Sequence, residues 1–258
     1  MRQLVIIVIM LVLYLGSASG QTADASAILE QSRELTMPDA LEATITLTIT
    51  DKNGSSRVRT NSMVTKKYAD GTEKRLIRFV APAEVQGTSV LIHDYKDKQD
   101  DMWIYLPALK RVRRIVTTEK GKSFMGSEFT NADISSPPAS DFVNRHLEGS
   151  GRGNQYIIES IPVSAEIASE YGFSRKVSFF EMKSLHLSRM EFYDKGGVLV
   201  KTIVVNDIES LGNDGRYMVK SMRAENHLTG RSSSMAMDKI NSSVKPPDTL
   251  FDVQNLDR

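Results

Sequence analysis

The feature that most constrains the fold is a series of short segments in which apolar and polar residues alternate. In the first of them, Leu41–Thr50, every second residue from Leu41 to Ile49 is apolar, and most of the residues between them are threonines. A period of two is typical of a β-strand with one buried face and one solvated face. Asn53-Gly54 follows, and this dipeptide favours a tight hairpin turn because both residues tolerate positive φ values.

Similar turn sequences recur along the chain and separate runs rich in Val, Ile, Thr, Tyr and Phe. They are Asp70-Gly71, Asp194–Gly197, Asn213–Gly215 and Thr229-Gly230. Strands joined by tight turns form an antiparallel meander, whereas parallel pairs need long crossovers. The further predicted strands are Lys74–Val80, Ser89–Asp94, Asp101–Leu106, Tyr156–Ile161, Arg175–Met182, Leu185–Tyr193, Val198–Asn206, Arg216–His227 and Ser232–Ile240.

One helix is predicted over Asp24–Leu35, where Met37-Pro38 ends the helical pattern. Two irregular stretches, Thr117–Ser140 and Glu148–Asn154, are expected to be loops or lids. The expected fold is therefore mainly β with few helices: a large curved antiparallel sheet, open or nearly closed, with helices and loops over one face. Since β-rich domains reach ~200–250 residues, residues 21–258 are expected to form one domain.

Residues 1–20 have the pattern of a secretory signal peptide. Arg2 precedes an apolar run, Leu4–Leu15, and the small residues that end at Gly20 suit signal peptidase. An uncleaved membrane anchor is the alternative, but the run is well short of the ~20 apolar residues that span a bilayer. We therefore expect cleavage near Gly20 and export to the periplasm.

Composition and motifs argue against several classes of function. The formal net charge of +1 includes Arg2, so the mature chain would be neutral, which argues against a nucleic-acid partner. The absence of cysteine excludes disulfides and thiolate sites. The four histidines lie far apart without a zinc motif, and no Gly-x-Ser-x-Gly elbow is present. Gly121-Lys122-Ser123 resembles the end of a P-loop, but Val116 stands where that motif needs glycine. We predict no metal, no cofactor and no enzymatic activity.

Methionine and aromatic residues are the basis for a predicted binding site. The sequence has 12 methionines, and methionine adapts its shape at apolar binding surfaces. The alternative is that these residues only fill gaps in a core. On the concave face of a curved sheet they would line a deformable apolar cavity. The residues expected to bind lipid are Trp103, Tyr105, Leu106, Phe124, Met125, Phe129, Phe179, Met190, Phe192 and Met222.

A basic strand, Lys110–Ile115, follows the only tryptophan in the chain. The strand before it, Met102–Leu106, is apolar on both faces, so it is expected to be covered on both sides. At the rim of a cavity, the basic strand would attract an anionic head group or an acidic partner. The alternative is an edge strand whose charges prevent aggregation. The residues expected to bind the partner or head group are Lys110, Arg111, Arg113 and Arg114.

Four segments carry a resemblance to a known family. They read "MWIYLPALKRVRRI" from Met102, "GKSFMGSEFTNADI" from Gly121, "EFYDKGGVLVKTI" from Glu191 and "PPDTLFDVQNL" from Pro246. The chain resembles the exported outer-membrane lipoprotein-sorting proteins, relatives of the LolA and LolB carriers, over nearly its whole mature length. The resemblance implies an incomplete antiparallel β-barrel with a covered, apolar concave face. It also implies a periplasmic role in carrying lipids or lipoproteins, an RND-type transporter as a partner, and no enzyme. Residues 123–130 would form a lid or mouth.

Three functional hypotheses follow from these observations. The leading one is a monomeric periplasmic carrier that binds the acyl chains of a lipid or lipoprotein for transfer toward the outer membrane. The second is an interaction or sensor module that docks on a transporter or envelope protein without transferring lipid, in which case the basic strand matters most. The third, a hydrolase of envelope lipids, has no motif behind it.

Overall fold

The alternating segments pair into one sheet of thirteen antiparallel strands. The computed structural model describes residues 24–36, 38–96 and 98–257, so the predicted signal peptide lies outside the described residues. The strand order is β6-β5-β4-β3-β2-β1-β13-β12-β11-β10-β9-β8-β7. The strands are β1 (Ala40–Thr50), β2 (Ser56–Lys67), β3 (Glu73–Ala81), β4 (Ser89–Asp94), β5 (Asp101–Leu106), β6 (Arg111–Ile115), β7 (Phe142–His146), β8 (Gln155–Pro162), β9 (Arg175–Glu181), β10 (Leu187–Tyr193), β11 (Leu199–Leu211), β12 (Arg216–Asn226) and β13 (Ser232–Asn241).

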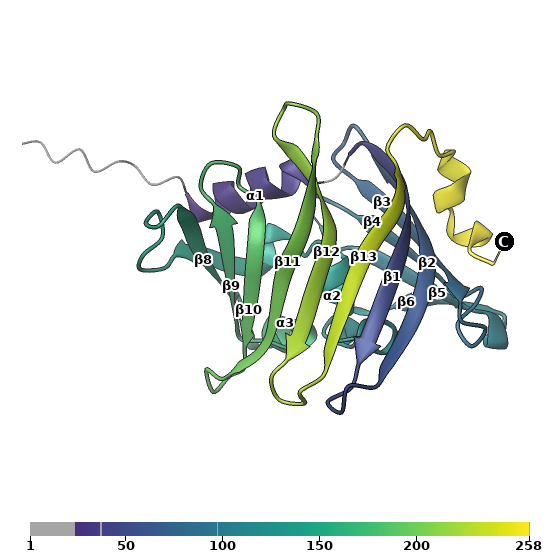
Figure 1. The fold of residues 1–258 in the computed structure, drawn as a ribbon, viewed down its shortest axis with the longest axis horizontal. Helices are drawn as coiled ribbons and strands as arrows, with labels where there is room; N and C mark the ends of the chain where they lie inside the picture. Colours follow the sequence, from purple (N-terminus) through teal and green to yellow (C-terminus); the bar gives the residue numbers. More distant parts are fainter. Residues whose placement is uncertain (1–23, 37, 97, 258) are drawn as a thin grey trace, which may run out of the picture.

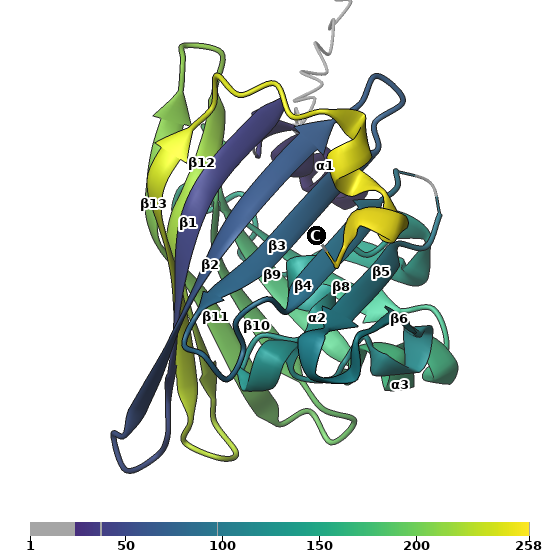
Figure 2. The ribbon, with the colours of Figure 1, turned by 90° about the vertical axis from the view of Figure 1, so that its right-hand side faces the viewer.

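The sheet consists of two meanders, which are joined by the pairing of the first and last strands in the sequence, β1 and β13. Strands β1 to β6 follow one another in space as in sequence, and so do β7 to β13. The meanders meet where β1 pairs with β13, with Thr46 opposite Ala236. Strands β6 and β7 therefore lie at opposite edges of the sheet. Figures 1 and 2 show the sheet curving around a concave face without closing into a barrel, which confirms the predicted incomplete barrel.

The concave face of the sheet carries the main hydrophobic core. On β1 the apolar residues from Leu41 to Ile49 are all buried in this core, while most residues between them are partly exposed. Met102 and Ile104 of β5 also belong to it. The alternation seen in the sequence therefore sorts side chains to the core face and the outer face as predicted.

The described part of the chain forms three α-helices beside the sheet: α1 (Ala25–Leu35), α2 (Asn131–Ile134) and α3 (Ala165–Tyr171). Helix α1 was predicted, and its Ile28 packs against Ile158 of β8 and Phe180 of β9. Helix α3 was not predicted because it has only seven residues. The Ser164 side chain caps its start by accepting a hydrogen bond from the Ile167 amide, at 3.2 Å. None of the helices within the described ranges is long and apolar enough to cross a membrane.

Two strands, β2 and β7, were not predicted from the sequence pattern. Strand β2 begins with Ser56, Arg57, Val58 and Arg59, and its first three residues are exposed, so its alternation is weak there. Strand β7 has only five residues and lies at the sheet edge. Both form because a neighbouring strand supplies hydrogen-bonding partners, an effect that intrinsic β propensity does not record.

The C-terminal segment packs on the convex face of the sheet. Two short 3-10 helices, Asp248–Phe251 and Val253–Asn255, lie there (Figure 2). Phe251 packs with Leu76 of β3 and Leu91 of β4, and its carbonyl oxygen hydrogen-bonds the His93 ring at 2.9 Å. This contact closes a second hydrophobic cluster on the side of the sheet opposite to the main core.

We expect Phe251→Ala to lower the free energy of unfolding by about 3–5 kcal/mol, because the side chain is 0% exposed and its removal leaves a cavity. Urea unfolding followed by circular dichroism measures the change. Leu228→Ala is the control, since the Leu228 side chain is 68% exposed and its loss is expected to change stability by less than about 0.5 kcal/mol. Equal stability of Phe251→Ala and the unmutated protein would contradict a structural role for the C-terminal segment.

Candidate functional site

The connection between β6 and β7, residues 116–141, crosses the concave face of the sheet. The connection has to run from one edge of the sheet to the other, because β6 and β7 lie at opposite edges. We call this connection the crossing segment. Phe124, Phe129 and Ile134 anchor it in the main core. A capping box fixes α2 within it, since the Thr130 hydroxyl accepts from the Asp133 amide at 3.2 Å and the Asp133 carboxylate accepts from the Thr130 amide at 2.7 Å.

Close packing also holds the crossing segment against α3. The Gly121 amide donates to the Glu170 carbonyl oxygen at 2.6 Å. A Cβ atom on Gly121 would lie 2.8 Å from the backbone of Tyr171, which is closer than packing allows. Glycine is therefore required at this position for the segment to approach the helix.

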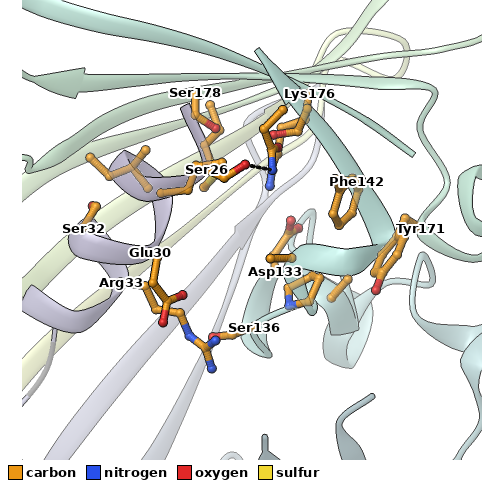
Figure 3. A pocket seen from close by; sticks show the side chains of 18 of the residues that line it. Ser26, Glu30, Ser32, Arg33, Asp133, Ser136, Phe142, Tyr171, Lys176 and Ser178 are labelled. Carbon is orange, nitrogen blue, oxygen red and sulfur yellow. Dashed lines mark hydrogen bonds between the residues drawn. The ribbon is translucent and has the colours of Figure 1, made fainter. Parts of the chain in front are cut away.

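One cavity, which we call the α1 cavity, lies between α1, the crossing segment and strands β7 to β10. Its volume is about 300 Å³. Figure 3 shows the α1 side chains Ser26, Glu30 and Arg33 on one side of it and Phe142 and Tyr171 on the other. About half of the residues that line it are polar or charged, although most of the lining surface is apolar. The large apolar side chains of the lining are Leu29, Phe142, Phe173, Phe180, Leu187, Met190 and Phe192.

A second cavity, which we call the β1 cavity, lies on the other side of α2. Its volume is about 210 Å³, and its lining includes Ile45 and Leu47 of β1. Four methionines contribute to its wall, and their flexible side chains can repack around different shapes. Asp133, Ser135 and Ser136 line both cavities, so the crossing segment forms the partition between them. The four methionines are Met63, Met222, Met235 and Met237.

Four of the ten residues predicted to bind lipid line these cavities. Phe124 and Met222 line the β1 cavity, and Met190 and Phe192 line the α1 cavity. Phe129 is fully buried in the main core beside a third hollow. The structure thus brings these residues to one face of the sheet, from strands β10 and β12 and from the crossing segment.

The other predicted lipid-binding residues line neither cavity. Leu106 and Met125 pack against the main core. Trp103 and Tyr105 point to the convex face, where they join the cluster around Phe251. The sequence pattern indicated that β5 has two apolar faces, but it did not show which face would be concave. Phe179 does not line them either, and its ring centroid lies 4.1 Å from the Arg189 guanidinium.

The basic strand β6 is an edge strand, as the alternative interpretation of its charges required. Arg113 forms an ion pair with Glu119 at 2.5 Å, and Arg114 forms one with Asp101. Lys110 and Arg111 are exposed and form no ion pair with any described residue. The structure therefore leaves only two of the four predicted basic residues without a partner.

Lys176 is a residue of the α1 cavity that the sequence pattern did not reveal. It lies on β9 and lines the cavity, and its Nζ is 5.3 Å from the centre of the Phe142 ring. Burial lowers the pKa of Lys176, Asp133 opposes this effect and Lys201 adds to it. The sequence could not indicate this environment, because these two charges come from the crossing segment and from β11.

A network of buried polar side chains lies at the ends of β4 and β5. Arg33 of α1 pairs with Asp94, whose side chain is 3% exposed, at 3.0 Å. Lys120 of the crossing segment donates to Gln99 and, at 3.2 Å, to the Tyr171 hydroxyl. We call these residues, together with Asp100 and Asp141, the polar seam. It links α1, the β4–β5 connection, the crossing segment and α3.

Burial raises the pKa of two acids of the polar seam, Asp94 and Asp100. It raises the pKa of Asp94, and the guanidinium of Arg33 opposes the rise. Burial, together with the negative charge of Asp94, raises the pKa of Asp100 to about 7. The Ser135 hydroxyl lies near enough to lower that pKa, although neither Asp100 oxygen accepts a hydrogen bond of normal geometry. No three His, Asp or Glu side chains in the described ranges are grouped to hold a metal ion.

Comparison with protein families gave a match over most of the chain. A family model that is described as an uncharacterized protein matches residues 71–258. The chain belongs to this family. A comparison with curated proteins gave no match.

Solved structures relate this family member to lipoprotein-sorting proteins. An outer membrane lipoprotein-sorting protein domain from Vibrio parahaemolyticus is 26% identical, with a TM-score of 0.80 over 91% of this chain and 98% of that one. A DUF1329 family protein from Desulfovibrio piger is 27% identical, with a TM-score of 0.77 over 90% and 97% of the two chains.

A LolA superfamily protein from Nitrosomonas europaea has the same fold. Its TM-score is 0.67 at 17% identity, over 89% of this chain and 97% of that one. The LolA-like fold and the resemblance to lipoprotein-sorting proteins, both predicted from the sequence, are confirmed.

We expect Asp100→Asn to raise the free energy of unfolding of the protein by about 1–3 kcal/mol at pH 8 and to have little effect on it at pH 4. The folded-state pKa of Asp100 is about 7, above the ordinary value of 3.8. Its contribution to stability is therefore fully present below pH ~4 and is lost as the pH rises through 7. Urea unfolding at several pH values measures the difference.

Asp214→Asn is the control for this experiment. Asp214 is exposed, and hydrogen bonds from Arg216 lower its pKa, so its substitution should give no gain in stability at pH 8. A gain at Asp100 that is equally large at pH 4 and pH 8 would show that the carboxyl charge is not its source.

Proposed function

We propose that the protein is a periplasmic carrier that binds the acyl chains of a lipid or lipoprotein and passes them toward the outer membrane. The observation that carries this proposal is the pair of cavities on the concave face, which α1 and the crossing segment cover. The α1 cavity, at about 300 Å³, reaches the lower end of the range of ligand pockets, ~300–1,000 Å³. Its aromatic and aliphatic walls suit hydrocarbon chains.

A carrier of acyl chains needs a cover that can move, and here the crossing segment would be that cover. Burial of one methylene contributes about 0.8 kcal/mol, so a chain of a dozen methylenes binds strongly and must also be released. Only the thin partition at Asp133, Ser135 and Ser136 separates the two cavities. Displacement of the crossing segment would therefore join them into one larger space.

The similarity to known proteins supports the same proposal. The Vibrio parahaemolyticus neighbour is named for outer membrane lipoprotein sorting, and the Nitrosomonas europaea neighbour belongs to the LolA superfamily. We propose by analogy that this chain also acts in the periplasm after cleavage of its signal peptide, as a monomer and by binding rather than by catalysis. An RND-type transporter is the proposed docking partner.

Met190→Trp is expected to weaken the binding of a fluorescent fatty-acyl probe by about tenfold, because the larger side chain fills the α1 cavity. Met222→Trp tests the β1 cavity in the same way. Fluorescence titration measures the dissociation constants. The control is Val204→Trp, since Val204 is exposed on β11 next to the buried residue Ile203 and so points to the opposite face. If all three variants bind the probe like the unmutated protein, these cavities are not the binding site.

A second function, docking on a protein partner, is favoured by the position of β6. An edge strand presents unpaired backbone N–H and C=O groups to which another chain can add. Lys110 and Arg111, the two basic residues without an ion pair, would then attract an acidic segment of the partner. This function does not require any transferred lipid.

We expect the double substitution Lys110→Glu and Arg111→Glu to abolish co-purification with a detergent-solubilised RND-type transporter and to leave acyl-probe binding unchanged. Reversal of these charges places two acids beside an acidic partner, which suppresses association. The matched control is Lys52→Glu with Lys195→Glu, which makes the same charge change at two exposed turns. Loss of transporter binding in the control as well would point to net charge and not to β6.

A further inference from the structure

The α1 cavity has a polar end and an apolar end, and the strand register separates them. At the polar end, Lys176 of β9 lies opposite Ser160 of β8 and Phe192 of β10. At the apolar end, Phe180 lies opposite Leu187, under α1. Lys176 and Phe180 are four residues apart on one strand, so they share the concave face at a separation of about 13 Å.

The positive charge at the polar end is incompletely neutralised. Lys176 forms no hydrogen bond and no ion pair with any residue in the described part of the chain, and its contact is the Phe142 ring. The carboxylate that acts on it, Asp133, already binds Lys201 at 2.5 Å and the Thr130 amide at 2.7 Å. Two ammonium groups thus share one carboxylate. A partly buried charge without a counterion is unfavourable unless something else pairs with it.

Unpartnered polar atoms lie next to this charge. Ser160 is 1% exposed, lines the cavity and makes no hydrogen bond through its hydroxyl within the described residues. Asn144, opposite Ser160 on β7, donates through its side-chain nitrogen to the Ser26 hydroxyl at 3.4 Å, and its side-chain oxygen is unpartnered. Buried polar groups nearly always have partners, so a ligand is the natural complement to this set.

We propose that the α1 cavity binds a single-chain amphiphile with a small anionic head, a carboxylate or a phosphate. Its oxygens would pair with the Lys176 ammonium and accept a hydrogen bond from the Ser160 hydroxyl. The hydrocarbon chain then runs along β9 and β10 toward Phe180 and Leu187, beneath α1. This inference rests on the proposed carrier function and narrows its cargo. A cavity of about 300 Å³ suits one chain. An anionic head forms an ion pair with an ammonium in addition to hydrogen bonds, whereas a neutral head can accept a hydrogen bond but cannot form the ion pair.

Isothermal titration calorimetry with three amphiphiles of one chain length tests the inference: dodecanoate, dodecyl phosphate and dodecanol. We expect the unmutated protein to bind at least one anionic amphiphile roughly 10- to 100-fold more tightly than dodecanol. Lys176→Met should remove this preference by weakening the binding of the anions, with a much smaller effect on the binding of dodecanol. Lys176→Arg should retain part of it, and Ser160→Ala should reduce it. The anion that binds more tightly, dodecanoate or dodecyl phosphate, identifies the class of head group.

The control is Lys183→Met, which removes one exposed charge in the turn after β9 and should keep the preference for anions. Thermal unfolding of each variant shows whether it folds. Equal affinity for the anions and dodecanol, in both the unmutated protein and Lys176→Met, would overturn the anion site and leave the carrier function intact. Failure of all three amphiphiles to bind would refute the carrier function itself. Inorganic phosphate that binds as tightly as dodecyl phosphate would show a site for the free ion and overturn the amphiphile.

Discussion

The pairing of β1 with β13 is the constraint on which the rest of the structure depends. It joins two antiparallel meanders, and it places β6 and β7 at opposite edges of a sheet that does not close. The connection between these strands, residues 116–141, therefore has to run from one edge to the other, and it does so across the concave face, where Phe124 and Phe129 are buried. An open, curved sheet would otherwise expose a large apolar surface to water, at an unfavourable free energy that grows with the area. The crossing segment and α1 cover this surface.

The cover fills the concave face only in part, and its chemistry is mixed. Apolar anchors such as Phe124 and Phe129 hold the crossing segment in the core, while Asp133 and Lys120 fix it through charges and hydrogen bonds. Polar contacts can be exchanged for contacts with water or ligand at less cost than apolar packing. In the proposed carrier, the apolar anchors would keep the cover in place, and its polar contacts would be exchanged when a hydrocarbon chain enters.

Much of the fold could be predicted from the sequence, and less of the site. The alternation from Leu41 to Ile49 and the Gly-containing turns indicated an antiparallel sheet, because period two and turn chemistry are local properties. The face to which Trp103 points is not local, since it depends on the curvature of the whole sheet and on the C-terminal segment that covers β5. The same holds for Lys176, whose environment comes from Asp133 and Lys201. Local patterns identify which residues share a face, and the topology decides what that face meets.

Native mass spectrometry of the mature protein, purified without detergent from a periplasmic extract, shows whether the protein carries an acyl ligand. If the protein is a carrier, we expect a mass above that of the chain, in a stoichiometric complex whose extracted ligand carries an acyl chain. The share of ligand-bound protein should be lower in the same preparation of Met190→Trp, because the larger side chain fills the α1 cavity. A protein that is empty in the extract and stays empty when fatty-acyl compounds are added would contradict the carrier account.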